Sequence, residues 1–109
     1  MIVTEDQIRD EITGAIAQNR VMLFMKGTPD MPRCGFSAQV VALLDDAGAE
    51  YGAIDVLPDP RIRQILSGQS GWPTIPQLFV DGQLVGGCDI VTELHDSGEL
   101  QQLVRPGQG

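Results

Sequence analysis

Cys34 is the residue whose type and position most directly predict chemistry. It begins the run Cys34-Gly35-Phe36-Ser37, which follows a loop containing Gly and Pro and opens a predicted helix. Unpaired N–H groups and the dipole at a helix N-terminus favour an anion, so they stabilise a thiolate there. The dipole contributes about 0.3–1 kcal/mol, which changes a pKa by only about 0.2–0.7. We therefore expect a reactive thiol that needs a further cation.

Lys26 is the candidate for that cation. It is the only lysine of the chain, and it directly follows the apolar run of residues 21–25. This run is typical of a strand, so Lys26 stands at an expected strand end. The alternative is an ordinary solvated lysine, and these residues alone leave both interpretations open.

The fourth residue of the run, Ser37, limits the redox chemistry of Cys34. A dithiol protein has a second cysteine in Cys-x-x-Cys that resolves mixed disulfides, whereas a hydroxyl cannot attack a disulfide. A mixed disulfide at Cys34 therefore has to wait for an external thiol or for Cys88, the other cysteine of the chain. The alternative for each cysteine is a buried, inert thiol.

Length, charge and hydropathy exclude several classes of protein. The 109 residues suit one domain. A formal net charge of −8 repels phosphate backbones, so we expect no nucleic-acid partner. The apolar run of residues 21–25 is far too short to span a membrane. Two cysteines are too few for a disulfide scaffold, and the acidic N-terminal residues resemble neither a secretory signal nor a transit peptide. We therefore expect a cytoplasmic protein.

Hydrophobic spacing and turn residues predict an alternation of helices and strands. A capping box at Thr4 begins the first helix, and Asp59-Pro60 begins the third. The pair Asp81-Gly82 between two apolar runs indicates a two-residue hairpin. The predicted elements are helix 5–18, strand 21–25, helix 35–47, strand 51–56, helix 61–66 ending near Gly68, strands 77–80 and 83–85, and helices 89–97 and 99–104.

This order predicts an α/β fold with a thioredoxin-like arrangement. The first two strands are separated by a helix and should pair in parallel through a right-handed crossover, whereas the hairpin strands pair antiparallel. The result is a mixed four-stranded sheet flanked by helices, in the order α-β-α-β-α-β-β-α. Residues 105–109 are predicted to form a short flexible tail.

Four motifs then occur in order along the chain. They are Lys26-Gly27-Thr28, Cys34-Gly35-Phe36-Ser37, Trp72-Pro73-Thr74-Ile75-Pro76 and Gly86-Gly87-Cys88-Asp89. Together they resemble a monothiol glutaredoxin of the C-G-F-S type, and the resemblance covers about residues 4–104. It implies a single glutaredoxin domain over residues 1–109, with glutathione as a cofactor.

The resemblance assigns the first half of the site. Cys34 is implied as the catalytic thiol and as the metal ligand, and Phe36 of the same motif as part of the glutathione site. Lys26 is implied to bind the glycyl carboxylate of glutathione, which favours the functional interpretation of this lysine. Arg63 matches a second contact to a glutathione carboxylate.

The second half of the site is implied by the later motifs. Pro76 is expected to be cis and to lie opposite the thiol, so that the main chain of Ile75 pairs with the extended backbone of glutathione. Gly87 and Cys88 are implied to hold the γ-glutamyl end at a helix N-terminus. Asp89 is expected to cap that helix and to accept from the ligand's ammonium group, although a plain N-cap predicts the same residue.

Three conspicuous residues are expected to lie outside the site. Trp72 is interpreted as a packed aromatic residue of the loop before the hairpin. Arg61 is expected to be solvated. His95 has no partner in any motif and is interpreted as a residue on a helix surface.

The first functional hypothesis is an iron–sulfur carrier. A [2Fe–2S] cluster needs four ligands, which are usually thiolates. Counting cysteines alone allows two Cys34 plus two Cys88 from two chains, and only the resemblance selects two Cys34 plus two glutathiones. It implies a homodimer that forms around the cluster, delivery to apo iron–sulfur client proteins, and a BolA-like partner.

The alternative hypothesis is an enzyme, a glutathione-dependent thiol–disulfide oxidoreductase. Cys34 would attack a glutathionylated protein, and a second glutathione would resolve the mixed disulfide. The absence of a resolving thiol at Ser37 does not forbid this monothiol route.

Overall fold

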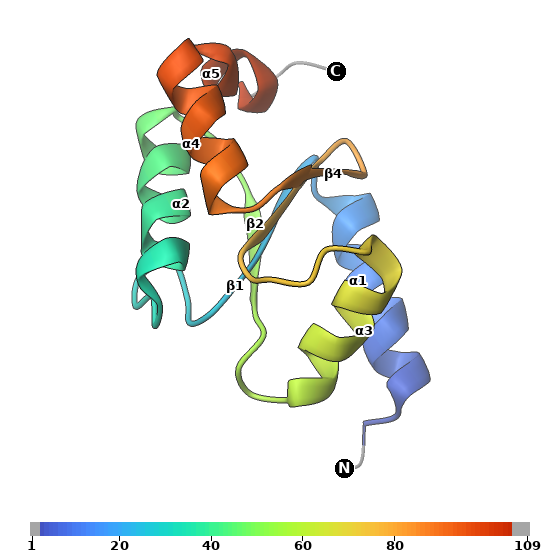
Figure 1. Cartoon of the computed structure of the whole chain (residues 1–109). Coiled ribbons are helices and arrows are strands. Elements are labelled where there is room, and N and C mark those ends of the chain that lie inside the picture. The colour runs from blue at the N-terminus through green and yellow to red at the C-terminus, as the bar shows by residue number, and fades with distance from the viewer. Residues whose placement is uncertain (1–2, 106–109) are drawn as a thin grey trace.

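The structure, a computed structural model, describes residues 3–105. Helices and strands alternate in the predicted order, and the α/β class is confirmed (Figure 1). The elements are α1 (Glu5–Gln18), β1 (Val21–Met25), α2 (Gly35–Asp46), β2 (Gly52–Asp55), α3 (Pro60–Ser70), β3 (Gln77–Val80), β4 (Gln83–Gly86), α4 (Cys88–Ser97) and α5 (Glu99–Val104). From residue 106 on, the predicted flexible tail lies outside the described residues.

The strands form the predicted mixed sheet, in the order β2-β1-β3-β4. β1 pairs in parallel with β2 and antiparallel with β3, and β3 pairs antiparallel with β4. Helix α2 provides the crossover that a parallel pair requires. Asp81 and Gly82, with φ of 52° and 77°, form the two-residue turn between β3 and β4, as this residue pair predicts.

Helices cover both faces of the sheet, α1 with α3 on one face and α2 with α4 on the other (Figure 1). The alternating side chains of β1 serve the two faces. Leu23 and Met25 belong to the core on the side of α2 and α4, whereas Met22 and Phe24 belong to the core on the side of α1 and α3. Every residue of β1 is therefore buried, which explains why this strand is a continuous apolar run.

α3 is longer than the sequence predicts. The expected end near Gly68 is wrong, because Gly68 continues the helix and Gly71 adopts the left-handed conformation that ends it, with φ of 73°. The N–H of Gly71 donates to the carbonyl of Ser67 at 2.9 Å. The other boundaries agree with the prediction to about one residue. Within residues 3–105, no helix combines the length and the apolar character needed to cross a membrane.

Candidate functional site

Cys34 lies at the N-cap of α2, where the loop after β1 ends. The N–H of Arg33 donates to the carbonyl of Lys26 at 2.9 Å, and Gly27 forms an isolated bridge with Pro32. Gly27 has φ of 87°, and a Cβ there would collide with the loop backbone. The loop thus folds back on itself and brings Cys34 beside the end of β1.

Backbone N–H groups at the start of α2 lower the pKa of Cys34. Interaction of the sulfur with the N–H of Ser37 has the largest effect, partial burial opposes it, and the N–H of Phe36 adds to it. The charge of Lys26 lowers the pKa by less, and the hydroxyl of Ser37 by less again. The expected effect of Lys26 is therefore present, but the backbone N–H groups at the start of α2 lower the pKa of Cys34 more than the lysine does.

Ser37 is fully buried, and its hydroxyl has a structural partner. Its Oγ accepts a hydrogen bond from the N–H of Lys26 at 3.1 Å. This contact ties the first turn of α2 to the end of β1, so Cys34 and Lys26 are held in a fixed relation. Ser37, at the fourth position of the motif, thus also fixes the position of the Cys34 thiol relative to Lys26.

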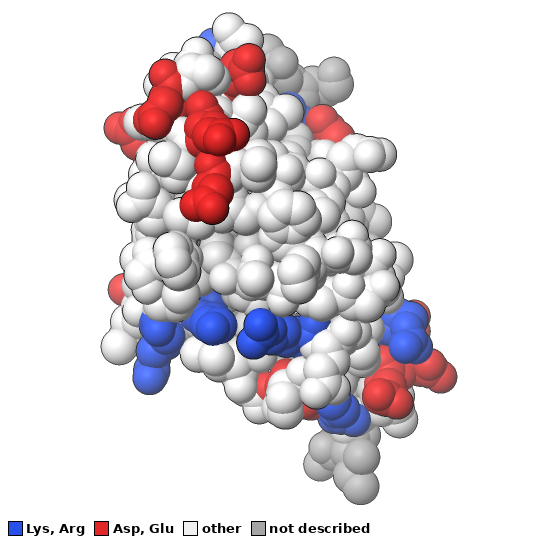
Figure 2. Space-filling view, viewed as in Figure 1, with Lys and Arg blue, Asp and Glu red and all other residues white. Residues whose placement is uncertain are grey.

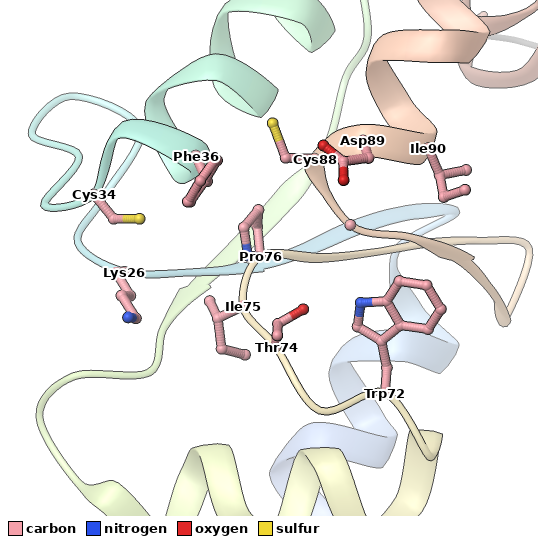
Figure 3. A pocket seen from close by; sticks show the side chains of 11 residues that line it. Lys26, Cys34, Phe36, Trp72, Thr74, Ile75, Pro76, Cys88, Asp89 and Ile90 are labelled. Atoms are coloured by element: carbon pink, nitrogen blue, oxygen red, sulfur yellow. The ribbon is translucent and has the colours of Figure 1, made fainter.

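A pocket of about 410 Å³ opens beside Cys34, where the N-termini of α2 and α4 face the loop before β3 (Figure 3). Eight of the nine residues predicted for the site line this pocket. They are Lys26, Cys34, Phe36, Ile75, Pro76, Gly87, Cys88 and Asp89. Three residues without a predicted site role line it as well, namely Trp72, Thr74 and Ile90. The structure therefore gathers residues from segments far apart in the sequence around one thiol.

Arg63 is the predicted site residue that does not line the pocket. It is exposed on α3, and its guanidinium donates to the carbonyl of Pro73 at 3.5 Å. This contact places Arg63 beside Pro73, and the residues that follow Pro73 line the pocket. Arg61, expected to be solvated, instead pairs with Asp59 at 2.8 Å. Asp59 also caps α3, so Arg61 takes part in the start of that helix.

The peptide bond between Ile75 and Pro76 is cis, as the resemblance implies. Figure 3 shows Pro76 between Cys34 and the start of α4. The next residue, Gln77, pairs with Phe24 of β1. Because Lys26 lies two residues beyond Phe24, this pairing brings the main chain of Ile75 near the end of β1.

α4 begins at Cys88 with Gly87 as its N-cap, and no side chain caps it. The prediction that Asp89 caps this helix is wrong, because Asp89 lies within the first turn and is exposed toward the pocket. A Cβ at Gly87 would lie 3.2 Å from both the carbonyl oxygen of Pro76 and Nε1 of Trp72. Glycine thus permits this close approach, and the first N–H groups of α4 are left for an anion.

The two cysteines are both free and both half-buried. The sulfur of Cys34 points toward the pocket, whereas that of Cys88 points toward α2 (Figure 3). The Sγ of Cys88 lies 4.0 Å from Oγ1 of Thr92, one turn further along α4. Cys34 and Cys88 also line a second hollow between α2 and α4.

Trp72 and His95, which are predicted to lie outside the site, each have contacts that the sequence does not predict. Trp72 lines the pocket, and its buried Nε1 has no hydrogen-bond partner among residues 3–105. His95, interpreted as a residue on a helix surface, has Nε2 3.0 Å from Oδ2 of Asp46 and Nδ1 3.4 Å from Oδ1 of Asp96. Hydrogen bonds with Asp46 and then Asp96 raise the pKa of His95. His95 therefore joins α4 to the end of α2, away from the pocket.

Charge is unevenly distributed over the face that carries the site. Figure 2 shows Lys and Arg side chains in a band across the lower half of this face, and Asp and Glu side chains gathered near its top, where Figure 1 shows α4. Lys26 belongs to the lining of the pocket, and Asp89 lies on its α4 side. A chain with a formal net charge of −8 thus presents a local cationic edge to a ligand.

The model of the glutaredoxin family matches residues 21–85. The chain belongs to this family. This glutaredoxin is 53% identical over 94 residues to "Probable monothiol glutaredoxin 2" of Rickettsia typhi, which covers 86% of this chain and 85% of that protein. It is also 53% identical over 100 residues to "Monothiol glutaredoxin-S11" of Oryza sativa subsp. japonica. That match covers 92% of this chain, which spans only 20% of the length of the rice protein.

Solved structures confirm the thioredoxin-like glutaredoxin fold. The solution structure of reduced poplar apo GrxS14 is 42% identical, with a TM-score of 0.78 and coverage of 89% of each chain. A crystal structure of a buckwheat glutaredoxin–glutathione complex is 27% identical, with a TM-score of 0.79 and coverage of 92% of this chain and 89% of that one. The single motif cysteine of this glutaredoxin agrees with the monothiol names of its relatives.

Proposed function

We propose that this monothiol glutaredoxin binds glutathione in the pocket and carries a [2Fe–2S] cluster to apo-proteins. The observation that carries the proposal is Cys34, an accessible thiol of lowered pKa at the start of α2 with no second cysteine in its motif. A thiolate that no internal disulfide consumes is available to bind iron. The cluster is cargo that has to be taken up and released, which suits a ligand at the mouth of a pocket.

The pocket matches glutathione in charge and size. Its volume of about 410 Å³ lies within the range of small-molecule sites. Lys26 would bind the glycyl carboxylate, and the uncapped start of α4 would bind the γ-glutamyl carboxylate. Asp89 would accept from the ligand's ammonium group, and Arg63 would add a cation at the edge. The buckwheat relative that binds glutathione has the same fold.

The number of ligands requires two protomers. Within the described residues, no group of three or more His, Cys, Asp and Glu side chains could hold a metal. The sulfur of Cys34 points toward the pocket, whereas that of Cys88 points toward α2, so we infer that Cys34 is the thiolate that binds the cluster. Two Cys34 thiolates and two glutathiones complete the four positions of the cluster. We infer a holo homodimer, whereas the charge of −8 disfavours association of the apo protein.

Cysteine variants test this ligand set. Cys34→Ser and Cys88→Ser are reconstituted anaerobically with iron, sulfide and glutathione and compared by visible absorption. We expect Cys88→Ser to hold a cluster and Cys34→Ser to hold none. A Cys88→Ser protein without a cluster would contradict ligation by glutathione.

Size-exclusion chromatography with light scattering tests the assembly. We expect an apo monomer and a holo dimer with one cluster and two glutathiones, linked by mass action. A stable apo dimer, or a coloured monomer with one cluster per chain, would contradict the bridged assembly. The holo dimer is also the species to test for transfer to apo iron–sulfur clients and for binding of a BolA-like protein, which we propose as partners.

The lowered pKa of Cys34 also favours a second function, reduction of glutathionylated proteins. The Cys34 thiolate attacks the glutathione sulfur of a mixed disulfide, and the client leaves as a thiolate. A second glutathione thiolate then attacks this sulfur, which releases glutathione disulfide and restores Cys34. Turnover of a glutathionylated peptide by the apo protein, compared with Cys34→Ser, measures this activity.

A further inference from the structure

Gln77 is a polar side chain in a fully buried position at the start of β3. Its Nε2 donates to the carbonyl of Trp72 at 2.9 Å and to that of Thr74 at 3.2 Å. A longer contact of 3.4 Å joins it to Oγ of Ser67 on α3. One amide thus ties the loop before β3, and the helix before that loop, to the sheet.

The loop that Gln77 holds forms one side of the pocket. Trp72 and Thr74 line the pocket, and Ile75 follows them directly. Nε1 of Trp72 lies 3.2 Å from the place where a Cβ of Gly87 would be, so the indole lies close against the start of α4. Displacement of this loop would therefore move the main chain of Ile75 and also remove a support from the α4 N-terminus.

This arrangement leaves two polar atoms without partners. Among the side chains that the structure describes, the buried N and O atoms lacking a hydrogen bond are Nε1 of Trp72 and Oε1 of Gln77. Rotation of the Gln77 amide would not satisfy them, because it would turn Oε1 toward two carbonyl oxygens. Buried unsatisfied groups are rare and destabilising. Violations of this kind are expected at functional sites.

We propose that Gln77 is a positioning residue for glutathione, which acts by holding the 72–74 loop against the pocket. The inference rests on the proposed glutathione site and names the residue that keeps it in shape. The hydrogen bonds of Gln77 are with Ser67, Trp72 and Thr74, and none of them involves Cys34. The effect of Gln77 is therefore confined to ligand binding and does not extend to ionisation of the thiol.

The first test is Gln77→Met, which keeps an unbranched chain and removes the donors. Trp72 is the only tryptophan, so its fluorescence reports the loop directly. We expect red-shifted emission, stronger quenching by acrylamide, and a Kd for reduced glutathione that rises about tenfold in calorimetry. The thiolate absorbance of Cys34 should titrate at an unchanged pH.

Two controls are matched to this variant. Gln83→Met makes the same substitution at the exposed first residue of β4. Ser67→Ala removes only the longest contact of Gln77. Both controls should keep the wild-type Kd for glutathione and the wild-type emission of Trp72.

A second variant, Gln77→Glu, gives a signature that a merely structural role does not predict. As a carboxylate it faces two carbonyl oxygens and repels them, whereas its protonated form donates one hydrogen bond. Burial raises the pKa of such a carboxyl, so glutathione affinity should recover toward the wild-type value as pH falls. Wild-type protein at each pH provides the reference.

If Gln77→Met binds glutathione with wild-type affinity, the inference about Gln77 is wrong, but the proposed function is unaffected. A parallel loss of glutathione affinity, Cys34 ionisation and thermal stability also overturns the inference, because it indicates a general structural role. A wild-type protein that binds no glutathione overturns the proposed function, and the inference with it.

Discussion

The helices on the two faces of the sheet begin in different ways. α1 and α3, on one face, begin with the side-chain caps Thr4 and Asp59. α2 and α4, on the other face, begin with Cys34 and Gly87, and no side chain caps either helix. A cap satisfies N–H groups that a helix start otherwise leaves unpaired. The uncapped pair therefore keeps donors available, at some loss of local stability.

The two uncapped helix starts use these donors differently. In α2 the N–H groups of Phe36 and Ser37 lower the pKa of the chain's own thiol. In α4 the N-cap is a glycine without a side chain to accept from the first turn. Both starts line one pocket. One face of the sheet thus provides stable helix starts, and the other provides a thiolate and an anion site side by side.

The largest expected effect comes from giving α4 the cap that it lacks. In Gly87→Asp the new carboxylate would take the N–H groups of the first turn and repel a ligand carboxylate. We expect the Kd for glutathione, measured by calorimetry, to rise about 100-fold.

Gly87→Ala is the matched control, because it has the same close approach to Pro76 and Trp72 without a carboxylate. A loss of about tenfold is expected there from crowding. Equal losses in the two variants would mean that crowding, rather than occupation of the helix start, explains the result.

Removal of Lys26, the lysine that lines the pocket, is expected to have a smaller effect. Lys26→Ala should raise the Kd for glutathione about tenfold, because a carboxylate loses its charged partner. The pKa of Cys34 should rise only slightly, since backbone N–H groups lower it more than Lys26 does.

Thiolate absorbance and calorimetry measure both effects of Lys26→Ala. Arg9→Ala on α1 is the control, because it changes the net charge equally at a distance from the pocket. An unchanged pKa of Cys34 in Lys26→Ala would show that the lysine has no activating role.

Removal of a helix cap on the α1 and α3 side of the sheet should lower stability and leave glutathione binding unchanged. Thr4→Ala removes the acceptor of the capping box and should lower the free energy of unfolding by about 1 kcal/mol. The Kd for glutathione should stay at the wild-type value. Urea denaturation measures the first quantity, and Thr13→Ala within α1 controls for the loss of a threonine. A change in glutathione affinity would contradict the view that the helix caps of α1 and α3 serve stability and not ligand binding.

The same contrast explains how far the sequence predicts the fold. The caps at Thr4 and Asp59 and the turn at Asp81-Gly82 are local, so their residues identify them directly. The predicted end of α3 is too early because Gly68 is typical of a helix end, whereas the residue that ends the helix is Gly71. Local chemistry is sufficient where a residue acts on its own neighbours in sequence.

The site was predicted less completely, because part of it depends on tertiary contacts. The sequence predicts Asp89 as the N-cap of α4, whereas the observed N-cap is Gly87, two residues earlier. Trp72 lines the pocket because Gln77 holds its carbonyl, a contact across five residues of loop. A polar residue within the apolar run 75–80 was the available signal. His95 and Asp46 meet although they lie far apart in the sequence.

That last contact gives the smallest expected effect. His95 joins the far ends of the two uncapped helices, because Nε2 lies 3.0 Å from Oδ2 of Asp46. Hydrogen bonds with Asp46 and then with Asp96 raise the pKa of His95 above 6.5, its ordinary value. The charged form is therefore favoured in the folded state. Its contribution to stability is fully present below the unfolded pKa and is lost as pH rises through the higher folded pKa.

The consequence is a pH-dependent difference between wild type and His95→Gln. The wild-type urea midpoint should exceed that of the variant at about pH 6, and the excess should disappear toward about pH 8. Asp46 is largely exposed and His95 is one-third exposed, so the difference is small. A proton NMR titration of the imidazole measures the pKa directly, and Asp46→Asn should lower it. An imidazole that titrates at or below its ordinary pKa in wild type would show that the two helices are not joined at this end in solution.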